Sequence, residues 1–217
     1  FALGLAQAAL AAADEACASF DAARTAGYPA GACLAAQANT LRAANRLEEA
    51  VAKLINATDE EKTSAEYLAA QGAIAVERGD SVTDTLNILE KAVESDSGQP
   101  LALFCLGVLH DRIGNDDEAI DCYQRSLLRY PATVGALMNL GLLYEDRDDF
   151  SQAQQCYRRI LDGLPIDAPG REEAISRAKL FLKDSAASGD RQLDEQEQRQ
   201  RDRCLLYTSP SPRDDGV

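Results

Sequence analysis

The sequence predicts an all-α fold: a right-handed solenoid of stacked helical hairpins, closed by a C-terminal helix. The first observation is a repeat, because residues 102–131 align without a gap on residues 136–165, 34 positions later. The second is composition, with 46% hydrophobic but only 6% aromatic residues, no tryptophan and much alanine. Small side chains suit many close helix contacts better than one aromatic core. A period of this length is typical of arrays in which each hairpin buries its apolar face against the next.

Small residues recur twelve positions apart, where the two helices of each hairpin are expected to cross. A small side chain at the crossing lets the backbones approach, and a proline ends the second helix because it cannot continue one. Crossings at positions 16, 50, 85, 119 and 153 place one extra residue between positions 50 and 73, most simply in the loop "NATDEEKTS". The repeat-defining positions are Gly4, Ala16, Ala38, Ala50, Ala73, Gly107, Ala119, Tyr123, Pro131, Gly141, Ala153, Tyr157 and Pro165.

The two aligned segments resemble the tetratricopeptide repeat (TPR), a helical hairpin of 34 residues. The matching positions are Leu103, Leu106, Gly107, His110, Ala119, Tyr123 and Pro131 with Leu137, Leu140, Gly141, Tyr144, Ala153, Tyr157 and Pro165. The register predicts five TPR units in residues 1–165, the first one truncated inside its first helix. A capping helix is expected over residues 166–188, and a charged linker over residues 189–203.

The C-terminal segment 204–217 differs from everything before it. Its first eleven residues, "CLLYTSPSPRD", match the translation of a nucleotide string that resembles a transposase-type sequencing adapter. We therefore expect residues 204–217 to be adapter read-through rather than native sequence, and exclude them from fold reasoning. In the same way, Phe1 is expected to be a broken end.

Charge and residue spacing argue against several classes of function. A net charge of −14 disfavours binding to nucleic acid or to an anionic membrane surface. Six scattered cysteines form no CxxC pair, so the sequence predicts no metal site and no cofactor. The single histidine, His110, stands where the sister repeat has Tyr144, which favours a packing role. No catalytic motif is present, and the sequence predicts a protein that is not an enzyme.

In TPR arrays the first helix of each hairpin lines a concave groove that takes a peptide or a partner helix. Carried onto this register, the groove residues are Asn39, Arg42, Tyr67, Ile74, Arg78, Phe104, Val108, Arg112, Met138 and Leu142. Four of them form a predicted apolar strip with acidic margins: Phe104, Val108, Met138 and Leu142. The expected partner is a protein or peptide segment, amphipathic and basic. The alternative is that these residues only pack against neighbouring hairpins.

Some members of the class bind a C-terminal carboxylate through a Lys/Asn clamp. Here Ala35, Phe104 and Val108 occupy positions where polar clamp residues would be expected, which disfavours that ligand.

Residues 66–203, most strongly from residue 100 onward, resemble a family of bacterial proteins. In these a TPR array precedes a domain similar to the C-terminal domain of the RNA polymerase α subunit. The runs that carry the resemblance are "GNDDEAIDCYQRSLLRYP", "GALMNLGLLYEDRDDFSQAQQCYRRILDGLP", "RAKLFLKDSAASGD" and "EQRQRDR". The resemblance implies a cytoplasmic transcription scaffold with RNA polymerase as a partner. Two alternatives stay open, a general assembly or chaperone adaptor and the docking array of an enzyme.

Overall fold

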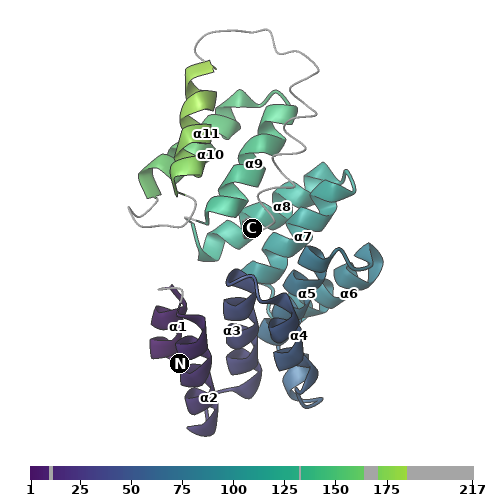
Figure 1. The fold of residues 1–217 in the computed structure, drawn as a ribbon. Helices are drawn as coiled ribbons and strands as arrows, with labels where there is room; N and C mark the ends of the chain where they lie inside the picture. The colour runs from purple at the N-terminus through teal and green to yellow at the C-terminus, as the bar shows by residue number, and fades with distance from the viewer. Residues whose placement is uncertain (10–11, 132, 164–170, 185–217) are drawn as a thin grey trace, which may run out of the picture. The chain divides into compact units, whose positions relative to one another are not determined.

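The computed structural model describes residues 1–9, 12–131, 133–163 and 171–184, and every regular element in these ranges is a helix. Pro165, the linker 189–203 and the segment 204–217 lie outside the described residues. The elements are α1 (Ala2–Ala9), α2 (Ala13–Thr25), α3 (Ala30–Ala43), α4 (Leu47–Ile55), the short 3-10 helix η1 (Glu61–Thr63), α5 (Ala65–Arg78), α6 (Val82–Ser95), α7 (Pro100–Arg112), α8 (Asp116–Arg129), α9 (Val134–Asp146), α10 (Phe150–Gly163) and α11 (Arg171–Asp184) (Figure 1).

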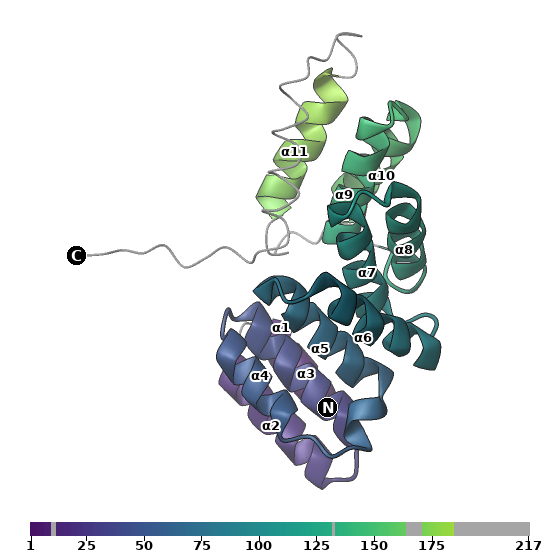
Figure 2. The ribbon, with the colours of Figure 1, turned by 90° about the vertical axis from the view of Figure 1, so that its right-hand side faces the viewer.

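The described residues divide into two compact units, and the division falls within α7, between Leu109 and His110. We call residues 1–109 the N-terminal unit and the described residues from 110 onward the C-terminal unit. In the N-terminal unit, α1 pairs with α2, α3 with α4 and α5 with α6. Successive hairpins meet through α2 against α3 and through α3 against α5, which Figure 2 shows side by side.

Local signals explain where the helices begin and end. The Oγ of Ser64 accepts a hydrogen bond from the backbone N–H of Tyr67, 3.2 Å away, and so caps the first turn of α5. At the other end of α5, Gly79 takes a left-handed conformation with a φ of 71° and donates its backbone N–H back to the last turn. The first helices of the hairpins are apolar on most sides, as buried helices are.

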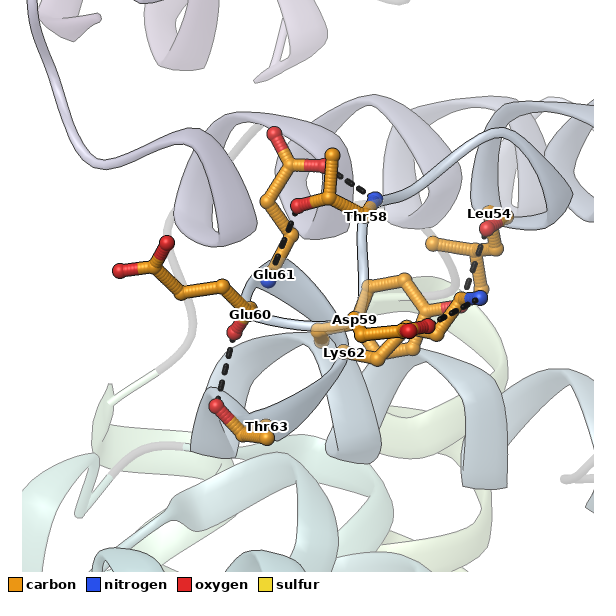
Figure 3. A network of polar contacts seen from close by, with 8 residues as sticks. Leu54, Thr58, Asp59, Glu60, Glu61, Lys62 and Thr63 are labelled. Carbon is orange, nitrogen blue, oxygen red and sulfur yellow. Dashed lines mark hydrogen bonds and ion pairs between the residues drawn. The ribbon is translucent and has the colours of Figure 1, made fainter.

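The connection between α4 and α5 contains nine residues, and Figure 3 shows its polar contacts. Thr58 and Glu61 bond reciprocally: the backbone N–H of Thr58 donates to Glu61 Oε2 at 2.7 Å, and the N–H of Glu61 donates to Thr58 Oγ1 at 3.4 Å. This is a capping box around η1, and it lowers the pKa of the Glu61 carboxyl. Arg24 at the end of α2 donates to Glu61 Oε1 at 2.8 Å, which ties the loop to the preceding hairpin. The predicted extra residue is found here, because α3 and α5 begin 35 residues apart.

Glycines stand where a large side chain sixteen or seventeen residues later presses against the first helix. A Cβ on Gly4 would lie 2.8 Å from the Phe20 ring, and a Cβ on Gly141 would lie 2.9 Å from Cζ of Tyr157. In the third hairpin the close approach is at Gly72, where a Cβ would lie 2.2 Å from Cδ2 of Leu89. The prediction had placed it at Ala73. That alanine is buried, but the branched end of the leucine reaches one residue further back.

In the C-terminal unit α9 packs against α8 and α10, and α11 packs against α10. The Tyr123 ring is fully buried and its hydroxyl accepts a hydrogen bond from Asn139 Nδ2 at 3.2 Å, which joins α8 to α9. The Tyr157 hydroxyl donates to the carboxylate of buried Glu145. The ring centroids of Tyr157 and Phe181 lie 4.8 Å apart, so α11 covers the last hairpin.

Candidate functional site

An ion pair joins the first helices of two neighbouring hairpins in the N-terminal unit. Nη1 of Arg42, in the last turn of α3, contacts Oε1 of Glu77, in the last turn of α5. The two side chains are 23% and 12% exposed, so the pair is half-buried and still open to solvent at its edge. Glu77 stands 35 residues after Arg42, which is the same position in the next repeat.

Two polar atoms beside this pair are buried and make no hydrogen bond. They are Nε of Arg42 and Oδ1 of Asn39, which lies one helical turn before Arg42 on α3. A buried donor or acceptor left without a partner costs about 1–3 kcal/mol relative to a satisfied one. Arg42 therefore holds Glu77 by a contact of one nitrogen, without the two parallel bonds that make an arginine–carboxylate pair strong. Such atoms mark a place where a ligand group would be favourable.

The structure separates the predicted groove residues into two groups. Arg78 and Arg112 are exposed, Phe104 is half-buried, and Arg78 pairs with Asp80 at 3.5 Å. Tyr67 and Ile74 are each only 4% exposed. The Tyr67 hydroxyl donates to the backbone oxygen of Leu54 at 2.9 Å, so its polar end is already used within the fold.

The predicted apolar strip is not an open surface. Val108, Met138 and Leu142 are 1%, 3% and 0% exposed, and only Phe104 keeps partial exposure. The prediction that they present an apolar surface to a partner was wrong for these three residues. Their apolar side chains are covered within the chain itself, which is the alternative that the sequence left open.

Most basic side chains of the N-terminal unit are already paired with acids. Residues 1–109 contain seven Lys and Arg but fifteen Asp and Glu, and six of the seven bases form ion pairs. The pairs are Arg24–Glu61, Arg42–Glu77, Arg46 with Asp14 and Glu49, Lys53–Asp21, Lys62–Asp59 and Arg78–Asp80. The remaining acids give this unit a net negative surface, which attracts cationic groups.

The described residues offer no other kind of site. In these ranges no group of three or more histidine, cysteine or acidic side chains is arranged to hold a metal ion. Within the same residues, no helix has the length and apolar character needed to cross a membrane. His110 is half-buried with a buried Nδ1.

Two buried thiols give the C-terminal unit a pH dependence. Burial raises the pKa of Cys122 and of Cys156 from about 9 to about 11, because the thiolate is poorly solvated there. Between pH 9 and pH 11 the unfolded chain releases these protons while the folded chain keeps them. The free energy of unfolding is therefore constant below pH 9 and falls as the pH rises toward 11.

We expect this alkaline loss to amount to about 1–2 kcal/mol per thiol, since one pKa unit corresponds to about 1.4 kcal/mol. Urea unfolding of the chain at pH 8.5 and at pH 10.5 measures it. A variant with Cys122→Ala and Cys156→Ala retains every other titrating group and should lose less stability over the same interval. Equal losses in the two proteins would show that the thiols do not contribute.

Comparison with known proteins decides the family. Residues 100–133 and residues 136–172 each match a family described as tetratricopeptide repeat. The chain contains tetratricopeptide repeats. Such repeats indicate a protein–protein interaction scaffold, as the sequence predicted.

Photosystem I assembly protein Ycf3 of Prochlorococcus marinus is 23% identical to this TPR chain over 111 residues. The match spans 49% of this chain and 62% of that protein. The crystal structure of TTC0263, a thermophilic TPR protein of Thermus thermophilus, is 18% identical, with a TM-score of 0.62 over 83% of this chain and 95% of that one. The crystal structure of MamA is 20% identical with a TM-score of 0.49, over 80% and 96%. The likeness to TTC0263 shows the fold alone, and it confirms the predicted all-α class.

Proposed function

We propose that this TPR chain is an assembly scaffold that binds a basic, amphipathic segment of a partner protein through its N-terminal unit. The observation that carries the proposal is the charge of that unit: its bases are held in ion pairs, and its acids outnumber them two to one. The similarity to a protein named for the assembly of photosystem I supports the assembly role. The binding site that fits best lies between α3 and α5, around Asn39, Arg42 and Glu77.

The test is binding of a short fluorescent peptide of leucine and lysine with helical periodicity, followed by fluorescence anisotropy. We expect it to bind, and to bind more weakly at about 300 mM than at about 50 mM salt, because salt screens exposed charges. A matched peptide with glutamate in place of lysine is the control and should not bind. Equal binding of the two peptides, or binding unaffected by salt, would contradict the proposal.

Three finer roles remain predictions from the sequence. A cytoplasmic transcription scaffold is supported by the resemblance of residues 66–203 alone, and retention of the chain on core RNA polymerase would test it. Absence of retention there, together with binding of the basic peptide, would favour the general adaptor. The docking array of an enzyme is the third role, and its test is co-purification of an activity.

A further inference from the structure

The repeat register shows an exception at Arg42. Positions 42, 77, 111 and 145 are equivalent in successive first helices, separated by steps of 35, 34 and 34 residues. Three of these positions carry acids, namely Glu77, Asp111 and Glu145, and only the first carries a base. This base contacts the acid at the equivalent position in the next repeat.

The contact between Arg42 and Glu77 has features of an interaction that can be exchanged. Arg42 uses Nη1, while its Nε is buried without a partner. Both side chains keep some exposure, so a competing cation can approach Glu77 from solvent. If Arg42 turned outward, its Nε would gain water, and the loss of the ion pair would be partly offset.

We propose that Arg42 is a built-in substitute for a basic side chain of the partner. In the free chain Arg42 occupies Glu77, and on binding an arginine or lysine of the partner segment takes its place. The proposal rests on the proposed function, since it names the subsite at which a basic partner binds. The contact with Arg42 is then autoinhibitory: it keeps a half-buried carboxylate paired until the partner arrives.

Charge alone would also change the affinity, and the chain offers a matched control for that effect. Lys91 lies exposed on α6, in the same unit but on the second helix of a hairpin. Removing Lys91 makes the unit more negative by one charge, as removing Arg42 does. Only the loss of Arg42 leaves Glu77 without its internal cation.

The experiment measures the affinity of the leucine–lysine peptide for the full chain and four variants. We expect Arg42→Ala to bind about two- to fivefold more tightly than the wild type, as loss of a competing, partly exposed ion pair allows. Arg42→Gln keeps much of the side-chain volume and should do the same if the alanine variant folds poorly. Lys91→Ala should bind more tightly by clearly less than Arg42→Ala. Glu77→Gln should bind more weakly than the wild type, and adding Arg42→Ala to it should give no further gain.

Other outcomes overturn the proposal. If Arg42→Ala and Arg42→Gln bind more weakly than the wild type, Arg42 contacts the partner directly. If they gain no more than Lys91→Ala, the effect is one of net charge. In both cases the proposed function stands, because the peptide still binds. If neither the wild type nor any variant binds the peptide, the proposed function fails and this inference fails with it.

Discussion

Replacing Gly141 with leucine is expected to lower the free energy of unfolding by at least about 1–3 kcal/mol, as overpacking does. Even a single added carbon would lie 2.9 Å from Cζ, 3.1 Å from Cε1 and 3.2 Å from Oη of Tyr157. The tyrosine cannot move aside easily. Its ring is fully buried, its hydroxyl is bonded to Glu145, and the ring of Phe181 packs against it.

Thermal unfolding followed by circular dichroism measures the effect of Gly141→Leu. Gly98→Leu is the control, because a Cβ on Gly98 would meet only Oδ1 of Asp96, at an ordinary distance of 3.6 Å. We expect the control to stay within about 0.5 kcal/mol of the wild type, as surface changes usually do. Equal destabilisation by the two leucines would mean that the helices of the last hairpin do not approach each other at Gly141.

Replacing Phe20 with alanine is expected to release the first hairpin, with a loss of about 3–5 kcal/mol, as is typical when a buried aromatic ring is removed. Phe20 is 0% exposed and packs with Ala16 and Cys33. Its ring also lies against Gly4 on α1, and its centroid is 5.3 Å from that of Phe1. The ring thus connects α1, α2 and α3, and α1 is only eight residues long. A helix of that length is not stable alone.

Hydrogen exchange locates the loss caused by Phe20→Ala. Amides of residues 2–9 should lose their protection first, while those of α9 and α10 should keep theirs. Leu5→Ala is the control on the same helix, since Leu5 is 50% exposed and its removal leaves no cavity. Unchanged protection in residues 2–9 of the Phe20→Ala protein would show that this ring does not hold α1 in place.

The sequence predicted the helical hairpins well because the repeat encodes them several times over. It did less well on contacts that depend on how far one side chain reaches. A fixed spacing of twelve residues selected Ala73, whereas Leu89 presses on Gly72 because its branched end extends past the crossing. No count along the chain contains that information, since it depends on the rotamer of Leu89.

The candidate site was half predictable. Asn39 and Arg42 followed from the register, but Val108 and Leu142, on the same face, are covered in the fold, and their composition does not distinguish a buried apolar residue from an exposed one. Glu77 was missed, although a signal for it existed. Opposite charges one repeat apart, at positions 42 and 77, predict an ion pair between neighbouring first helices.

The nine-residue connection before α5 has a consequence for comparing this chain with its relatives. The steps between equivalent helix starts are 34 residues before and after it, and 35 across it. One extra residue inside a helix would rotate everything after it by about 100°, because an α-helix has 3.6 residues per turn. The capping box of Thr58 and Glu61 instead lets the loop absorb the extra residue. A repeat-by-repeat alignment should therefore open its gap between Ile55 and Ala65, where length can vary without turning a face of the array.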